Sequence, residues 1–265
     1  MVPTDSPAPA ATQSAAAAAP AVGPATEPGS LSPLARAVAI FVRPAAAWGG
    51  LRERGQWWIP MLAVLLLTLL GSALLYHRAQ LPTILDAMEE RVSSGQMTAE
   101  QLQRIEDFYG GPAGLAITMG MTAVSLAAIP FIIALLVWFA IGFVLGSPFR
   151  YRQALEVATW SSLVSVPPLI LTYVLAWIRQ SMHGIHVGLG VLLPEAGADD
   201  KLLRALGVFL DWLGPFGIWH VAVAVLGAAA LSGAPRKSVA WALGTLYAVC
   251  GLIAAGLAAL IPGGG

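Results

Sequence analysis

The sequence predicts an all-α, polytopic integral membrane protein with five transmembrane helices and a disordered N-terminal tail. Hydrophobic residues make up 57% of the 265 residues and charged residues only 11%, and the mean hydropathy is +0.75. A soluble domain carries about 25% charged residues, so this chain has too little polar surface to live in water. Five apolar stretches offer the roughly 20 residues that a helix needs to cross a bilayer.

The tail comprises residues 1–30, which are mostly Ala, Pro, Ser and Thr. A segment of this composition buries too little apolar surface to fold, so we expect disorder. A signal peptide would need a basic start and a strongly apolar centre, and Asp5 is the only charge before Glu27. We therefore do not expect the tail to be a signal peptide.

Residues 31–56 predict short amphipathic helices in the membrane interface. Ser32 is a good N-cap and Pro33 suits the first helical position, with Arg36 expected away from the apolar face. A plain topology anchor and a basic patch for anionic lipid headgroups are both open. The interfacial anchors expected here and at the start of the first span are Arg43, Pro44, Trp48, Arg52, Trp57 and Trp58.

The five spans are expected to form one membrane domain over residues 57–261. Their approximate ranges are 57–76, 113–146, 157–177, 206–231 and 239–261. Between the first two spans, a helix opened by Pro82 and a capping box of Thr98 with Gln101 predict a helical hairpin outside the membrane. The second span is expected to be one long helix, tilted or bent at Pro130, with a small-residue step at Gly142 and Gly146.

The third span contains Pro167 and Pro168, which cannot donate to the carbonyls one turn earlier. Broken, hydroxyl-rich helices occur in transporters, so this span is the best indication of a substrate path. At the start of the span, Glu156 is expected to pair with Arg152 one helical turn away. That pairing explains the acid better than catalysis does.

The fourth span carries an acid, a histidine and a proline. On a continuous helix, Asp211 and Pro215 fall on one face, and a bend is expected at the acid. His220 would lie nearly opposite and about 13 Å along the axis, so the two cannot form an acid–base dyad on this helix. A second stripe is expected to hold Trp212, Phe216, Trp219 and Val223.

The depth of Asp211 decides its role. Counting back about 20 residues from Ser232 places the acid at the interface and His220 nearer the middle of the bilayer. We expect an interfacial acid with aromatic anchors packed against neighbouring helices. A functional acid inside the membrane is the alternative.

The remaining candidates are weaker. His183 and His186 can share a helix face and bind a metal, but no motif places a third ligand, so we expect no metal site and no cofactor. Cys250 is the only cysteine, which excludes a disulfide within one chain. The fifth span has a packing seam of small residues, namely Ala240, Gly244, Ala248, Gly251 and Ala255.

The threading follows from the positions of the basic residues. With five spans, the arginines of residues 36–54, the Arg150/Arg152 loop and the Arg236/Lys237 loop fall on one side. The positive-inside rule then places the N-terminus in the cytoplasm and the C-terminus outside. Lys plus Arg equals Asp plus Glu at 14 each, so the overall charge does not suggest a nucleic-acid partner.

Several motifs resemble those of the Yip domain family, the Ypt/Rab-interacting membrane proteins and their bacterial relatives. They are the segments 41–48 and 51–60 before the first span, 98–102 in the outer loop, 149–154 before the third span, and Asp211, Phe216, Trp219 and Arg236–Lys237 in the fourth span and its exit. The resemblance implies five helices with a cytoplasmic N-terminus. Its eukaryotic members act in vesicle traffic by binding partners, and its bacterial branch implies the inner (cell) membrane.

These observations favour a non-enzymatic membrane scaffold that binds other membrane proteins, lipids or a second copy of itself. The chain shows no nucleophile-elbow motif, metal cluster or phosphate loop, so we do not expect an enzyme or a soluble substrate. A small transporter or channel that uses the proline-broken third and fourth spans is the alternative.

Overall fold

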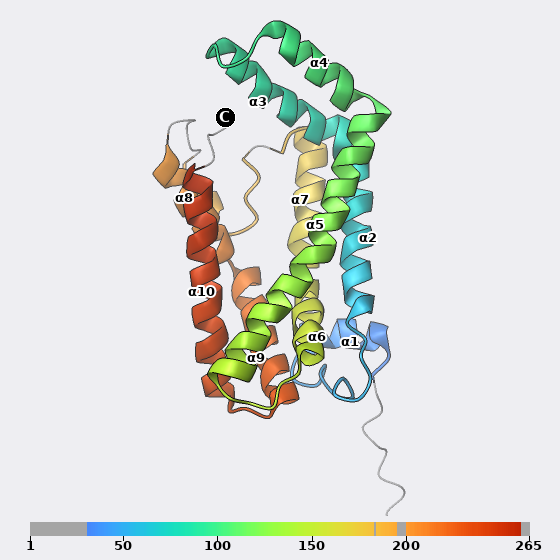
Figure 1. Ribbon diagram of the computed structural model, residues 1–265, viewed down its shortest axis with the longest axis vertical. Helices are drawn as coiled ribbons and strands as arrows, with labels where there is room; N and C mark the ends of the chain where they lie inside the picture. The colour runs from blue at the N-terminus through green and yellow to red at the C-terminus, as the bar shows by residue number, and fades with distance from the viewer. Residues whose placement is uncertain (1–30, 183, 195–199, 261–265) are drawn as a thin grey trace, which may run out of the picture.

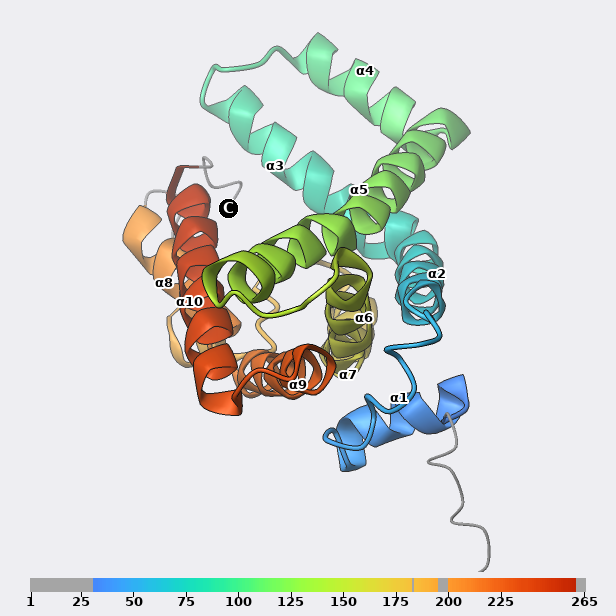
Figure 2. The same cartoon turned by 60° about the horizontal axis from the view of Figure 1, so that its bottom comes forward.

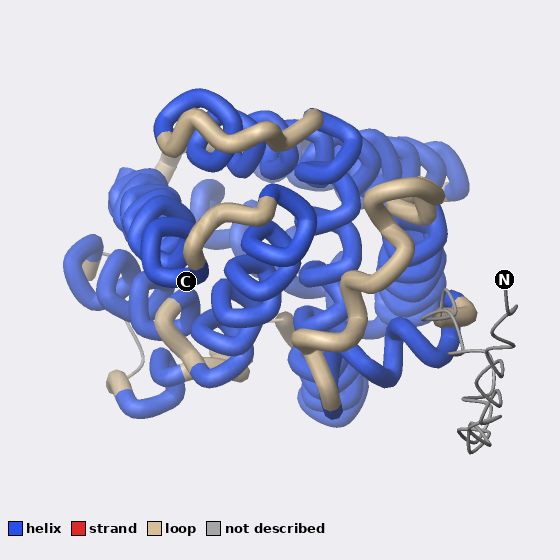
Figure 3. The backbone as a smooth tube through the Cα atoms, turned by 90° about the horizontal axis from the view of Figure 1, so that it is seen from below, coloured by secondary structure: helices blue, strands red, loops and turns tan. Residues whose placement is uncertain are grey.

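The computed structural model describes residues 31–182, 184–194 and 200–260, which consist of helices joined by loops (Figure 3). Within them, five helical segments are long and apolar enough to cross a membrane, as predicted. They are Trp58–Ser93, Pro112–Val144, Tyr151–Arg179, Pro215–Ser232 and Arg236–Leu260. The tail over 1–30 that was predicted to be disordered, His183 and the end of the last predicted span lie outside the described residues.

The first helix, α1 (Pro33–Val42), lies crosswise to α2 at one end of the molecule (Figure 2). Ser32 is its N-cap, as predicted, because the side-chain oxygen accepts a hydrogen bond from the Ala35 amide at 3.3 Å. A second short helix after Pro44 was expected, but the structure has turns there. Trp48, which we predicted to be an interfacial anchor, is only 3% exposed and packs into the protein core.

The predicted hairpin outside the membrane consists of α3 (Leu81–Ser93) and α4 (Ala99–Gly110), which project beyond the bundle (Figure 1). The expected capping box is present, with the Gln101 amide donating to the Thr98 side chain at 3.2 Å and the Thr98 amide donating to Gln101 Oε1 at 2.9 Å. A π-helical segment, η1 (Tyr76–Gln80), joins α3 without interruption to α2 (Trp58–Leu75).

The second span is one long helix with Pro130 inside it, as expected. It comprises α5 (Pro112–Trp138) and a π-helical extension, η2 (Phe139–Val144). The predicted small-residue step at Gly142 and Gly146 is wrong, because Gly146 has a φ of 62° and lies in the turn after the helix.

The third span changes helix type at its centre. It runs through α6 (Tyr151–Ser161), a 3₁₀ segment η3 (Ser162–Ser165) and α7 (Val166–Arg179). Both prolines of this span lie in the first turn of α7, where a missing amide hydrogen removes no intrahelical bond. The prolines are therefore accommodated at the junction between η3 and α7.

The fourth span is not the continuous helix predicted over 206–231. It is divided into α8 (Lys201–Trp212) and α9 (Pro215–Ser232). Proline disfavours a helical conformation of the residue before it, and Gly214 is accordingly extended, with φ −61° and ψ 168°. The helix therefore breaks at Gly214 instead of bending at Asp211, and Pro215 begins a new helix.

The last helix, α10 (Arg236–Leu260), packs against both halves of the fourth span. In Figure 1, α8 lies beside the upper part of α10, and α9 lies toward its lower end. The main core is formed by buried residues of α1, α5, η2, α6, η3, α9, α10 and the loops that precede α2 and α6. Within it, Trp48 packs against Gly227 of α9, where a Cβ atom would lie 2.5 Å from the indole ring.

The α3–α4 turn and the α5–α6 loop lie at opposite ends of the bundle (Figure 1). With the threading that the basic residues predict, a cysteine at Ser94 reacts with an impermeant thiol reagent in intact cells, in a Cys250→Ala background. A cysteine at Ser147 reacts only after the membrane is permeabilised. Labelling of Ser147 alone would reverse the threading, and labelling of both in intact cells would contradict the five-span arrangement.

Candidate functional site

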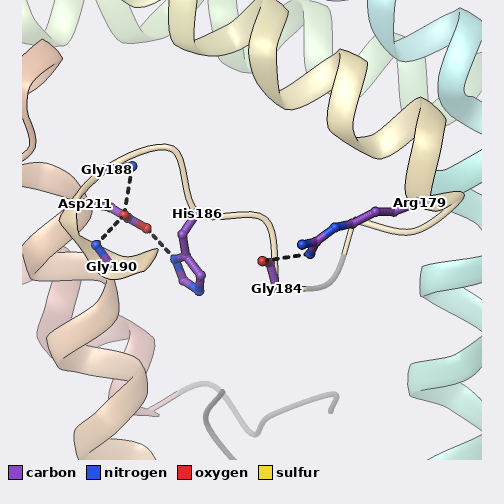
Figure 4. Close-up of polar contacts among 6 residues, drawn as sticks. All are labelled: Arg179, Gly184, His186, Gly188, Gly190 and Asp211. Atoms are coloured by element: carbon purple, nitrogen blue, oxygen red, sulfur yellow. Dashed lines mark hydrogen bonds and ion pairs between the residues drawn. The ribbon is translucent and has the colours of Figure 1, made fainter. Parts of the chain in front are cut away.

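Asp211, near the end of α8, holds a loop that folds back from the end of α7 (Figure 4). Its Oδ1 accepts hydrogen bonds from the backbone amides of Gly188 at 3.2 Å and Gly190 at 2.9 Å. Its Oδ2 lies 2.7 Å from Nδ1 of His186. Because an ionised carboxylate can only accept hydrogen bonds, His186 carries its proton on Nδ1 when Asp211 is charged.

The two glycines of this loop are required by its close approach to the acid. A Cβ atom on Gly188 would lie 2.6 Å from the Asp211 Cα, and one on Gly190 would lie 2.6 Å from Oδ1. Both distances are shorter than a carbon or oxygen contact allows. The short spacing of Gly188 and Gly190 is therefore the sequence feature that permits the loop to bind Asp211.

The depth of the site follows from its neighbour Trp212, which is bonded to α10 in both directions. The Trp212 indole donates to the Tyr247 carbonyl at 3.1 Å, and the Tyr247 hydroxyl donates to the Trp212 carbonyl at 2.6 Å. Tyr247 lies about 17 Å along α10 from Arg236, and the whole helix is about 37 Å long. Asp211 is thus level with the middle of α10.

The third and fourth spans meet at this depth around a cavity of about 260 Å³. Pro168 and Thr172 of α7 line one side, and Asp211, Gly214 and Phe216 line the other. The loop closes the cavity with Ile185, Val187 and Gly188. The structure therefore brings together Pro168, Asp211 and Phe216 from the predicted set, and it adds His186 as the partner of the acid.

The predicted aromatic stripe of the fourth span does not form, because the break at Gly214 changes the direction of the chain. Trp212 packs against Tyr247, whereas Phe216 and Trp219 are each 38% exposed on the outside of α9. His220 turns inward, with Nε2 3.5 Å from the Ser161 hydroxyl.

A second polar site lies at the other end of the bundle, around Glu156 of α6. This fully buried carboxylate accepts hydrogen bonds from the Gln56 amide at 2.6 Å and from the Trp160 indole at 3.1 Å. Arg152 interacts with Glu156 only through its charge and forms no direct ion pair with it, because its Nη2 donates to the Arg52 carbonyl at 2.6 Å. Glu156 therefore ties the loop before the first span to the start of the third.

Arg36 belongs to the same site, although its place in the sequence predicted a polar, exposed position. Its side chain is 1% exposed and donates to the carbonyls of Ala47 and, at 3.0 Å, Gly49. Its guanidinium lies 5.4 Å from the ring centroid of Trp160. Burial lowers the pKa of Arg36, and the charge of Glu156 raises it. Arg36 lies away from the apolar face of α1, so the periodicity of the helix did not predict its burial.

The other predicted anchors differ in their surroundings. Trp58 is 50% exposed, Trp57 packs edge-on against Phe131 with ring centroids 5.7 Å apart, and Arg43 is exposed where α1 ends. Pro44 is half-buried in the turn that follows. Arg52 is fixed on the protein, because its Nε donates to the Leu231 carbonyl at 2.9 Å.

Within the part of the chain that the structure describes, no three His, Cys, Asp or Glu side chains gather in a way that could hold a metal ion. The chemistry available at Asp211 is a carboxylate and an imidazole beside a small cavity. Such a pair can exchange a proton or attract a cation.

The fold and these contacts define an α-helical membrane protein with five spans. The family model of the Yip1 domain matches residues 38–258, and the chain belongs to this family. It is similar to the membrane protein YknW of Bacillus subtilis (strain 168), with 25% identity over 194 residues, which cover 72% of this chain and 76% of YknW. No solved structure shows a significant match.

Replacing Asp211 separates the role of its shape from the role of its charge. Asp211→Ala removes all three contacts, and we expect it to lower the free energy of unfolding by about 1–3 kcal/mol. Asp211→Asn keeps an acceptor for both glycine amides and can donate to His186, so its effect should be much smaller. Melting temperatures in detergent measure both. Equal losses would show that the negative charge itself holds the loop.

Trp212 should matter more for stability than Trp219, although both were predicted on one stripe. Trp212→Ala removes the indole hydrogen bond to the Tyr247 carbonyl and leaves a hole beside Gly251. A truncation in a packed site costs about 3–5 kcal/mol. Trp219→Ala removes a side chain on the exposed face of α9. Thermal unfolding of the two variants in one detergent tests this order, and equal destabilisation would contradict it.

Proposed function

We propose that this protein is a non-enzymatic membrane scaffold that binds other membrane proteins and lipids. The observation that carries the proposal is that two carboxylates, Asp211 and Glu156, form hydrogen bonds with other segments of the same chain. Asp211 binds two glycine amides and His186, and Glu156 binds the Gln56 amide and the Trp160 indole. Both carboxylates hold segments of this chain together, which is a structural role. The family membership supports the proposal.

The surface best suited to a protein partner is one face of α10. The C-terminal part of its predicted small-residue seam is buried within the protein, because Gly251 packs against the Trp212 ring. The other part faces outward: Ala240 and Ala248 are exposed, and the Cβ position of Gly244 has open space around it. Small residues let a second helix approach closely within a membrane. We infer that a transmembrane helix of a partner, or of a second copy, packs there.

For the placement in the cell, we infer a bacterial inner membrane with the N-terminus in the cytoplasm. The end of the bundle near α1 exposes several basic side chains, and the hairpin at the other end carries a group of acids, namely Asp86, Glu89, Glu90, Glu100, Glu106 and Asp107. The exposed basic residues are Arg43, Arg52, Arg54, Arg150, Arg236 and Lys237. The positive-inside rule and the Bacillus relative support this orientation and membrane.

Transport of a small solute is the second candidate. The observation that favours it is the cavity of about 260 Å³ between two interrupted spans, beside Asp211 and level with the middle of α10. Discontinuous helices that meet near the midplane are typical of transporter sites. In this case Asp211 would act on a solute as well as on the loop.

In-membrane crosslinking tests the scaffold. A photoreactive residue at Trp241, which is 71% exposed beside the seam, should capture a discrete partner, whereas one at Val124 of α5, 70% exposed, should not. Gly244→Leu should then reduce the capture severalfold by filling the seam. Gly120→Leu is the matched control, because Gly120 also has open space around its Cβ position.

Capture that is equal at both positions and insensitive to Gly244→Leu would overturn the partner surface. Solute flux in liposomes containing only the purified protein, if abolished by Asp211→Asn in a fully folded variant, would replace the scaffold with the transporter.

A further inference from the structure

A cavity of about 670 Å³ lies at the end of the bundle near α1 and is not part of either site above. It opens where the α5–α6 loop passes the end of α9. Its polar lining includes Arg52, Arg150, Gln153 and Ser232, and its apolar lining includes Trp138 and Phe143. One cavity thus presents guanidinium groups and aromatic surface together.

The two arginines of this cavity differ in how the protein holds them. Arg52 Nε is bonded to the Leu231 carbonyl at 2.9 Å, which directs the rest of its guanidinium group. Gln153 Nε2 donates to the same carbonyl at 3.4 Å, so the Leu231 carbonyl near the end of α9 accepts two hydrogen bonds from the protein. Among the described residues, neither Arg52 nor Arg150 has a carboxylate within 4.0 Å. The cavity therefore presents two guanidinium groups that form no ion pair with a described residue.

The position of the cavity along the spans matches a membrane boundary. Ser232 is the last residue of α9, Arg150 directly precedes α6, and η2 ends at Val144, so three spans end or begin here. Phe143 is 71% exposed and Trp138 is 36% exposed on the adjoining helix surface. An aromatic surface at this depth contacts acyl chains while the arginines face the headgroup layer.

We propose that this cavity binds the headgroup of an anionic phospholipid. Planar guanidinium groups bind phosphate oxygens through paired, charge-assisted hydrogen bonds, and two arginines from separate segments can hold one phosphate between them. Trp138 and Phe143 then lie along the first part of the acyl chains. The amphipathic lining favours a lipid over a free phosphate ion, which would leave the aromatic surface without a partner.

This proposal rests on the proposed function, because it names the class of lipid that the scaffold binds. The experiment that tests the lipid site is independent of the experiment that tests the protein-partner surface. Lipid binding is measured at Arg52 and Arg150, whereas the partner surface is measured by crosslinks from Trp241 on α10. A negative result in the lipid-binding experiment therefore does not affect the interpretation of the crosslinking experiment, and the reverse also holds.

Native mass spectrometry of the purified full chain provides the test. The protein in detergent is titrated with phosphatidylglycerol or phosphatidylcholine, and the bound lipid is counted. We expect phosphatidylglycerol to bind preferentially, and Arg52→Gln/Arg150→Gln to weaken it by about tenfold or more, as the loss of charge-assisted contacts implies. Arg104→Gln, which removes an exposed arginine on α4, is the matched control and should bind as the wild type does.

The single variant Arg150→Gln guards against misfolding, because it leaves the hydrogen bonds of Arg52 and Gln153 to the Leu231 carbonyl in place. Its melting temperature should equal that of the wild type while phosphatidylglycerol binding falls. Equal binding of both lipids, or unchanged binding in the double variant, overturns the site. Displacement of phosphatidylglycerol by an excess of inorganic phosphate would identify a free-anion site and overturn the lipid assignment.

Discussion

Pro215 restricts the backbone of Gly214 to an extended conformation, and this restriction determines the arrangement of α8, α9 and the loop after α7. Because Gly214 is extended, the fourth span separates into two helices, and α8 can turn its last residues toward α10. Trp212 then bonds reciprocally with Tyr247, and Asp211 faces the loop that returns from α7. A continuous helix would have kept the acid on one face and left the loop amides without this acceptor. One backbone preference therefore determines where the loop, the cavity and the acid lie.

Buried charge organises the opposite end in a different way. Glu156 receives donors from the segment before the first span, and Arg36 reaches from α1 to the carbonyls of the following turns. An isolated charge is unfavourable inside a protein, so each group is stabilised by directed hydrogen bonds, and Arg36 also by the charge of Glu156. These contacts connect α1, its following loop and the third span. The membrane-spanning helices and the segment before them consequently form one core.

The sequence predicted the helical class, the five spans, the Ser32 cap and the Thr98 capping box, because these depend on local composition and short spacings. It did not predict the division of the fourth span, since two effects of proline competed there: a kink one turn earlier and an extended preceding residue. Nor did it predict Arg36 and Trp48 in the core, because an amphipathic pattern does not show which neighbour will cover a face. The partner of Asp211 was hidden for the same reason, since His186 lies 25 residues away in a loop.

The continuous helix from α2 through η1 to α3 has a mechanical consequence. The hairpin is joined to the first span without a flexible hinge, and Tyr76 at the junction donates to the Tyr109 carbonyl at the other end of the hairpin, at 2.9 Å. The hairpin and α2 are thus joined twice, through the backbone and through this hydrogen bond. Gly71 of α2 lies directly against the Tyr173 ring of α7, where no Cβ atom would fit. We therefore expect a displacement of the hairpin to reach the third span through this contact.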